Sequence, residues 1–448
     1  MVAELSILLE LPDLKILRSE LDETGSYIIW SESTQEGTVC RNCGETTCKY
    51  HGQDREITIR HLPILSHPTY IKLRPLRYEC ESCSEQLGRR VTTTQRVGWY
   101  NPKNSLSIAY EIHLLLSLVN STVQDVSIKE QISYDTVEGL LNHRINRDVD
   151  WSKIEKLEVV GIDEIALLKG HKNYVVIVTA RDADGQITLL AVLKDRKKET
   201  VKEFLASIPP RLRDTIHTVC CDIWESYINA FHETFNQTKM PPGQNSSERT
   251  CKIKPPEPVS IVIDRFHVAK LYRKALENAR KKEIKRLKAV LSKQEFKRFK
   301  NIRWTLRKKP AALETEEQDL LNELFALSPI LKEVYDLCHE LTAIFDTHYS
   351  RAEAMESLKL WRKKVQHSQV SFFDAFLKTL NKHFDHILNY FERRLSSGFV
   401  EGLNNKVKVL KRRCYGISKV QTLFQRLFLD LNGFRLFIPT FATTFEAT

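Results

Sequence analysis

The spacing of apolar and polar positions separates the first 150 residues into a β-rich part and a helical part. Alternation with a period of two, on both sides of Gly25, is typical of a hairpin of half-buried strands. Strands of this kind are predicted at 14–32, 57–62 and 69–78. From residue 105 the apolar positions recur every three or four residues, which predicts short helices at 106–119, 122–128 and 134–141.

The middle of the chain changes to strands that alternate with helices. Apolar runs bounded by turn residues predict strands at 157–162, 174–180, 187–193, 215–221 and 259–263. A hairpin turn at 182–185 joins the second and third of these strands, and helices are predicted at 199–208 and from Trp224. The segment 238–258 is rich in proline and polar residues and predicts a loop. The order βββαβαβ indicates a mixed α/β domain.

Helical patterns fill the next 120 residues. Residues 270–309 hold 17 lysines and arginines against three glutamates, which predicts a long basic amphipathic helix ending before Pro310. A run of charge is usually a solvated face, but this excess is larger than solubility requires and favours contact with phosphates. Residues 314–345 predict a helical hairpin broken at Pro329, and core packing and a dimer seam both explain its apolar face.

Composition places the chain among soluble proteins that bind polyanions. Its 448 residues are 42% hydrophobic and 28% charged, and its net charge of +11 favours nucleic acid as a partner. No run of 18 apolar residues is present, and the acidic start of the chain does not resemble a signal peptide. We therefore expect a cytoplasmic protein without membrane contact.

Five of the ten cysteines cluster between residues 40 and 83. The motifs Cys40-Arg-Asn-Cys43 and Cys80-Glu-Ser-Cys83 each place two thiolates on a tight turn, and two such pairs complete a tetrahedral Zn²⁺ site. Cys48 and His51 offer a further pair, which either binds the metal or stands apart from it. Because four thiolates leave no open coordination position, we expect this metal to support folding or DNA docking rather than catalysis.

The three helices after this module have the spacing of a helix-turn-helix. Ser133 is a candidate N-cap for the third helix, after a break of suitable length. The third helix continues into a basic stretch with Arg144 and Arg147, which suits a reader of the DNA major groove. A plain three-helix bundle explains the same pattern.

Three of the predicted apolar strands end in an aspartate, at Asp163, Asp222 and Asp264. The carboxyl ends of parallel strands meet at one edge of a sheet, so these acids can converge there. An aspartate at a strand end also commonly caps the next helix, which explains Asp222 or Asp264 taken singly. Three in succession favour a site for a hard cation, Mg²⁺ or Mn²⁺, with His267 nearby. Two such ions can clamp the attacking and leaving oxygens of a phosphoryl displacement.

A fourth acid, Glu401, begins a helical pattern near the C-terminus. Its buried face would be formed by Val400, Leu403, Val407 and Leu410. Its exposed side would be polar and basic, with Asn404, Lys408, Lys411, Arg412 and Arg413, and the last four would contact DNA. An acid among cations that attract DNA is expected if it completes a cation site beside a phosphodiester.

Taken in order, these motifs resemble those of the ISL-three family of bacterial insertion-sequence transposases. The matching stretches, after the paired CxxC motifs and the helix-turn-helix, are Gly161-Ile-Asp163-Glu164, Cys221-Asp222-Ile-Trp224, Val262-Ile-Asp264-Arg-Phe-His267 and Val400-Glu401-Gly402-x-Asn404. The resemblance implies an RNase H-like fold with a catalytic triad of Asp163, Asp222 and Glu401. It places Asp264 and His267 beside the triad as accessory residues and implies a helical insertion before the glutamate.

With this resemblance, the predicted architecture is a multidomain α+β protein. It has an N-terminal zinc-binding β module, a helix-turn-helix, and an RNase H-like α/β catalytic domain with a large all-helical insertion. The predicted boundaries are 1–98 for the zinc module, 99–150 for the helix-turn-helix, 151–269 and 396–448 for the catalytic core, and 270–395 for the insertion.

The sequence therefore predicts a bacterial insertion-sequence transposase that uses two metal ions and works at the nucleoid. It would bind terminal inverted repeats and target DNA as a homodimer or larger assembly, cleave DNA strands and transfer them to the target. Two alternatives fit the same residues: a non-catalytic DNA-binding regulator derived from a transposase, and an RNase H-like nuclease without strand transfer.

Overall fold

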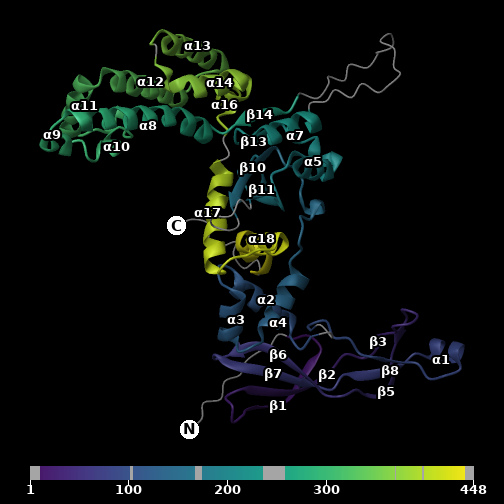
Figure 1. Ribbon diagram of the computed structural model, residues 1–448. Helices are drawn as coiled ribbons and strands as arrows, with labels where there is room; N and C mark the ends of the chain where they lie inside the picture. Colours follow the sequence, from purple (N-terminus) through teal and green to yellow (C-terminus); the bar gives the residue numbers. More distant parts are fainter. Residues whose placement is uncertain are drawn as a thin grey trace, which may run out of the picture. The chain divides into compact units, whose positions relative to one another are not determined.

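The computed structural model describes residues 11–100, 104–166, 174–235, 258–368, 370–395 and 398–438. The chain divides into two compact units, Met1–Ile145 with Gln425–Thr448 and Asn146–Phe424 (Figure 1). Each unit is described by itself. Within the described ranges, no helix has both the length and the apolar character needed to cross a membrane.

Three small sheets form the N-terminal part of the first unit. The elements are β1 (Leu14–Leu21), β2 (Tyr27–Ser33), β3 (Thr38–Val39), β4 (Thr46–Thr47), β5 (Lys49–Gln53), β6 (Ile57–Ile64), β7 (His67–Leu73), β8 (Leu76–Glu79), α1 (Glu81–Leu87) and β9 (Thr92–Thr94). The largest sheet has the order β1-β2-β7-β6, and β1 and β2 form the hairpin predicted around Gly25. Ile29, Ile59 and Ile71 are buried with Trp99 and form the core of this sheet.

Helices complete the first unit. They are α2 (Ile108–Leu118), α3 (Val123–Glu130), α4 (Tyr134–Arg144) and the later part of α18 (Val420–Phe437). Ser133 caps α4 as predicted, because its Oγ accepts a hydrogen bond from the Thr136 N–H at 3.1 Å. The buried Arg426 of α18 donates to the Leu118 carbonyl at 3.0 Å. Gly433 permits close approach of α18, because an added Cβ would lie 2.6 Å from Val119 Cγ2.

The first unit thus includes residues 425–438, whereas the sequence placed 396–448 in the catalytic core. The apolar face of α18 predicts that the helix is buried, but it does not indicate which of the two units the helix packs into. Leu429 packs with the residues of α2 and α4, and Gln425 Nε2 donates to the Ile145 carbonyl at 2.7 Å.

A five-stranded sheet is the centre of the second unit. Its elements are η1 (Trp151–Lys153), β10 (Val159–Ala166), β11 (Tyr174–Arg181), β12 (Ile187–Leu193), α5 (Lys198–Ser207), α6 (Pro210–Arg213), β13 (Thr218–Cys221), α7 (Glu225–Phe235) and β14 (Ser260–Ile263). The strand order is β12-β11-β10-β13-β14, antiparallel among β10, β11 and β12 and parallel among β10, β13 and β14. Strand β10 continues to Ala166, so Asp163 lies inside it and not at its end as predicted. The predicted loop at 238–258 lies outside the described residues, apart from Pro258.

Helices follow the last strand. They are α8 (Arg265–Val290), α9 (Lys293–Lys297), α10 (Ile302–Thr305), η2 (Pro310–Ala312), α11 (Thr315–Leu327), α12 (Pro329–Asp346), α13 (Arg351–His367), η3 (Ser371–Phe373), α14 (Asp374–Lys382), α15 (Phe384–Leu388), α16 (Tyr390–Arg393) and α17 (Gly398–Arg413). The predicted basic helix is shorter than expected, because a capping box of Ser292 and Glu295 starts a new helix after α8. Pro329 separates α11 from α12 as predicted.

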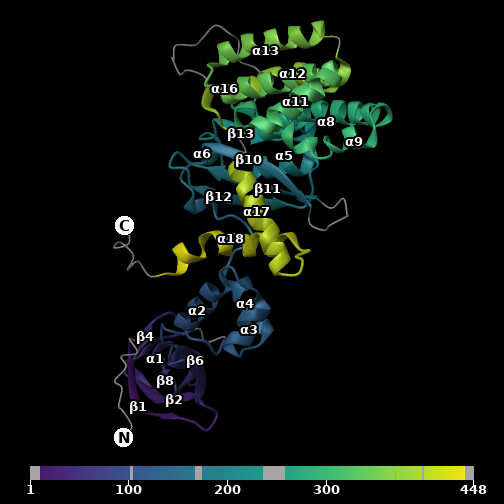
Figure 2. The same ribbon diagram turned by 90° about the vertical axis from the view of Figure 1, so that its left-hand side faces the viewer.

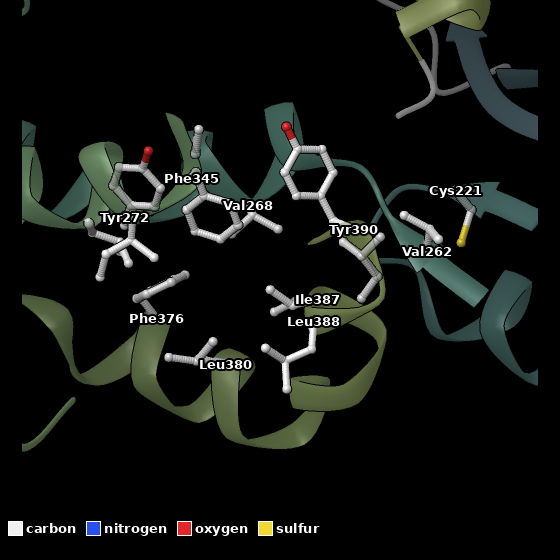
Figure 3. Close-up of a cluster of buried hydrophobic side chains, with 14 of the residues drawn as sticks. Cys221, Val262, Val268, Tyr272, Phe345, Phe376, Leu380, Ile387, Leu388 and Tyr390 are labelled. Atoms are coloured by element: carbon white, nitrogen blue, oxygen red, sulfur yellow. The ribbon is translucent and has the colours of Figure 1, made fainter. Parts of the chain in front are cut away.

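One hydrophobic core joins most of the helices between α8 and α16 to the sheet (Figure 3). Cys221 of β13 and Val262 of β14 belong to the same buried cluster as Tyr272 of α8 and Phe345 of α12. The apolar face of 314–345 is buried in this cluster, which favours core packing over the dimer seam. Helix α17 contacts β10 and β11, beside which it lies in Figures 1 and 2.

Candidate functional site

The strand register sets three aspartates at one level of the sheet. The last residue pairs of the parallel ladders are Gly161 with Cys220 and Cys221 with Ile263. Continuing the same register places Asp163 beside Asp222, and Asp222 beside Asp264. Side chains at one level of neighbouring strands share a face of the sheet, so the three aspartates lie at the same edge of it. Among the described residues, only the four paired cysteines form a group whose ligand atoms all lie within 4.8 Å of one another, so the aspartate oxygens are more widely spaced than that.

Electrostatic effects between these acids are consistent with their place at one edge of the sheet. Burial raises the pKa of Asp222 to about 6, and its pKa is also affected by His267, Glu164 and Asp163. Burial likewise raises the pKa of Asp163, on which His267 and Asp264 act as well. His267 therefore lies within electrostatic range of two of the acids, and its accessory role stays a prediction.

Each aspartate has different hydrogen-bond partners. Asp163 Oδ1 accepts from the Glu164 N–H at 2.7 Å, and its Oδ2 accepts from Asn404 Nδ2 at 2.6 Å. Asp264 accepts from the Phe266 N–H at 2.7 Å and so caps α8, which is the simpler role considered for it. Asp222 Oδ1 is buried and has no hydrogen-bond partner among the described residues. An orphaned carboxylate oxygen is costly and needs a further partner.

Asn404 corrects the predicted orientation of α17. The sequence placed it on the exposed basic side, but it is 5% exposed and donates to Asp163. Helix α17 buries this polar residue because the carboxylate of β10 gives it a partner, next to the apolar Leu403 and Val407. Glu401 precedes Asn404 by three residues and therefore occupies the same face one turn earlier. The side chains of Glu401 and Val400 lie outside the described part of the structure.

The donor set of this region fits a hard cation. Asn404 Oδ1 is a second buried oxygen that has no hydrogen-bond partner among the described residues. Arg196, whose charge lowers the pKa of Asp222, is itself paired with Glu164 at 3.0 Å and lies 4.3 Å from the Trp224 ring centroid. Oxygen ligands and partly unneutralised carboxylates are what Mg²⁺ or Mn²⁺ requires.

Sequence reasoning missed the side chains that support these acids. Arg196 and the buried Tyr227 were not singled out, and Tyr227 lies close enough to Glu164 and Asp222 for both to raise its pKa, after the larger effect of burial. The sequence could have indicated a role for Asn404 beside Glu401, because residues three positions apart on a helix share one face. Nothing in the sequence around Arg196 or Tyr227 indicates that these residues lie near the acids.

The predicted DNA-contacting cations divide into two groups. Arg144 Nε donates to the fully buried Glu111 at 2.8 Å, and Lys411 Nζ donates to the Ala166 carbonyl, so both have contacts inside the chain. Burial lowers the pKa of Lys411. Arg147, Lys408 and Arg412 are exposed, and Arg413 is half-buried. Contact with DNA stays a prediction for all six residues.

The four paired cysteines form a compact thiol cluster in the first unit. Cys40, Cys43, Cys80 and Cys83 lie with all their sulfurs within 4.8 Å of one another. Backbone N–H groups of Cys43 and Asn42 lower the pKa of Cys40 to about 6, which favours its thiolate. Four clustered sulfur donors fit Zn²⁺. Within the described ranges, Cys48 and His51 are exposed and outside this cluster.

Asp222→Asn should raise the melting temperature of the metal-free protein at pH 7.5 by a few degrees. When folding raises the pKa of an acid, the ionised acid lowers the free energy of unfolding at any pH above the folded-state pKa. Below the pKa that the acid has in the unfolded chain, it is protonated in both states and has no effect. For a pKa of about 6 the cost is about 3 kcal/mol at neutral pH. The gain should therefore vanish as the pH falls towards 4, which thermal unfolding across this range measures.

Asp184→Asn is a matched control, because Asp184 is an exposed residue in the turn between β11 and β12. It should leave the melting temperature unchanged at both pH values. Added Mg²⁺ or Mn²⁺ should stabilise the wild type and the control more than Asp222→Asn. Equal stabilisation of all three proteins contradicts a cation site at Asp222.

Comparisons with known proteins agree over most of the chain. A family model described as a transposase, DDE_Tnp_ISL3, matches residues 160–241 and 254–427, and a zinc-finger model of transposases IS204/IS1001/IS1096/IS1165 matches 36–83. The transposase for insertion sequence element IS1001 of Bordetella parapertussis is 27% identical over 404 residues, which cover 89% of this chain and 90% of that protein. The transposase for IS1557 of Mycobacterium tuberculosis is 22% identical over 425 residues, or 90% and 88% of the two chains.

Proposed function

Because this chain belongs to the ISL3 family of insertion-sequence transposases, we propose that Asp163, Asp222 and Glu401 hold divalent cations for DNA strand cleavage and strand transfer. When bound, Mg²⁺ or Mn²⁺ supplies Lewis-acid stabilisation of the charge that develops on phosphate oxygens. The observation that carries this proposal is the hydrogen bond from Asn404 to Asp163. This bond connects α17, which carries Glu401, to the three aspartates Asp163, Asp222 and Asp264, which we call the row of aspartates.

The chain's own residues hold the carboxylates in place. Asn404 and the Glu164 N–H fix both oxygens of Asp163, so its carboxylate cannot rotate freely. The Asp222 oxygen without a donor is left to bind a cation. Asp264 is the helix cap of α8 and contributes negative charge beside the ligands. His267 adds a polar group at the same edge.

The topology of the second unit supports an RNase H-like catalytic domain. Three antiparallel strands are followed by two strands parallel to the first, and helices α5, α6 and α7 lie between them in the chain. The helices from α8 to α16 interrupt this domain between the third aspartate and the glutamate. Their shared core with β13 and β14 joins the insertion to the sheet, and α17, which carries the glutamate, contacts β10 and β11.

We also propose roles for the first unit and for assembly. The zinc module and the helices α2, α3 and α4 would recognise terminal inverted repeats, with the exposed Arg147 at the basic end. The exposed Lys408 and Arg412 of α17 would contact the strand that is cut. Two transposon ends must be held together for transfer, so the active assembly would be a homodimer or larger.

Purified protein with Mg²⁺ or Mn²⁺ should cut labelled duplex DNA that carries the element's ends and should join the freed 3′ ends to a plasmid. Omission of the divalent cation should abolish both products. Binding without any cleavage would favour the non-catalytic regulator. Cleavage without joined products would favour a nuclease that lacks strand transfer.

A further inference from the structure

A basic cavity opens between α8, α10 and α12 in the helical insertion. Its volume is about 310 Å³, and seven lysine and arginine side chains line it against one glutamate. That glutamate, Glu277, is already paired with Arg280 at 2.7 Å and with Arg303 at 3.6 Å. We call this space the α8 cavity.

Four of the cations in the α8 cavity have no ion-pair partner among the described residues. They are Lys270, Arg273, Lys274 and Arg307. Like charges in one concave wall repel each other, and a bound anion relieves that repulsion. The wall also contains His339, whose buried Nε2 has no hydrogen-bond partner in the described ranges. These unmatched groups together indicate a ligand with several anionic oxygens.

An exposed aromatic ring lines the same cavity. Phe266 is 54% exposed and stands in the first turn of α8, two residues after Asp264. Lys270, Arg273 and Lys274 follow it at helical spacing, so the cavity begins near the row of aspartates and becomes more basic along α8. Cations beside an exposed aromatic face are the combination that binds single-stranded nucleic acid, in which each base stacks with about 1–3 kcal/mol.

We propose that the α8 cavity binds an unpaired nucleotide of the DNA strand that leaves the row of aspartates. Its base lies against Phe266, and its phosphates lie beside Arg273 and Arg307. This inference rests on the proposed transposase function and adds a single-strand subsite to it. A paired duplex cannot use this site fully, because its bases are not available to stack on Phe266.

The test compares blunt duplex DNA with the same duplex carrying a short single-stranded 3′ overhang, without divalent cations so that no cleavage occurs. The wild type should bind the overhang substrate more tightly. The double variant Arg273→Gln/Arg307→Gln should bind the overhang substrate about tenfold more weakly and keep its blunt-duplex affinity within about threefold of the wild type. For the overhang substrate, the slope of the logarithm of the binding constant against the logarithm of the salt concentration should become shallower by about 0.7 for each lost phosphate contact. Phe266→Ala should lose the same preference without a change in salt dependence.

Two controls separate this result from misfolding and from loss of charge. Lys288→Gln/Lys378→Gln removes two exposed cations outside the cavity and should keep the overhang preference, and Arg273→Lys/Arg307→Lys should restore much of it. Equal losses on blunt and overhang DNA, or no loss, overturn the proposed subsite. The Asp222→Asn protein should keep the overhang preference. A failure of the proposed cation site and a failure of the proposed single-strand subsite are therefore distinguishable.

Discussion

Asp222→Asn should lower cation-dependent cleavage of transposon-end DNA by on the order of a thousandfold or more. The change keeps the size of the side chain and removes the charge from the buried oxygen that has no hydrogen-bond partner. Stabilisation of phosphoryl transfer by a cation is worth several kcal/mol, and each 1.4 kcal/mol lost from the transition state costs tenfold in rate. Single-turnover cleavage of a labelled DNA end measures the effect.

Binding of the same DNA should stay within a few-fold of the wild type, because the first unit and the exposed cations are unchanged. Asp163→Asn and Glu401→Gln should behave like Asp222→Asn. Asp184→Asn should cleave normally, since this residue lies in a hairpin turn away from the acids. Undiminished cleavage by all three acid variants would exclude this site as the catalytic centre.

The strands of the second unit were predictable because their signals are local, whereas the single strand predicted at 69–78 is two strands, β7 and β8, in different sheets. Apolar runs that end at turn residues located all five strands of the second unit, and their parallel pairing then brought the aspartates to one level. The exact end of β10 was not predictable. Asp163 and Glu164 look like the end of a strand, but antiparallel pairing with β11 carries β10 on to Ala166. Pairing partners decide where a strand stops, and a single segment does not reveal them.

The orientation of polar side chains was the weakest part of the prediction. Amphipathic spacing assigned Asn404 and Lys411 to the exposed face of α17, yet both donate hydrogen bonds to β10. Arg144 was predicted to contact DNA, and the spacing gave no sign that it also pairs with the buried Glu111. A polar residue is buried where another element offers a complementary group, so its burial depends on tertiary neighbours that spacing alone does not contain.

The sequence predicted how many cations the basic stretch carries, but it did not predict which of them pair with acids of the same chain. Several of its cations are paired with acids from other helices, such as Arg298 with Glu323 and Lys308 with Glu317. Four cations without an ion-pair partner among the described residues line the α8 cavity, whereas others, such as Lys288, are exposed outside it. Only the folded arrangement distinguishes a solvated or paired cation from one that is left for an anionic ligand.

Zinc removal, or Cys80→Ser, should unfold the region around the thiol cluster while the rest of the chain stays folded. The buried cluster of this region consists of Cys40, Cys80 and Cys83, with Val91 packed against it. Without the metal it has almost no apolar core, and structural Zn²⁺ contributes about 10–16 kcal/mol to the folding of comparable small domains. Hydrogen exchange should show loss of protection in α1 and in β3 and β4.

The sheet β1-β2-β7-β6 should keep its protection, because Ile29, Ile59 and Ile71 give it a core of its own. Cys48→Ser is the matched control: its thiol is exposed in the same module, so this variant should retain one Zn²⁺ per chain and normal exchange. Zinc loss from Cys48→Ser contradicts the four-cysteine site. Retention of α1 protection after complete chelation contradicts the structural role, because it requires a core that the apolar residues of this region do not supply.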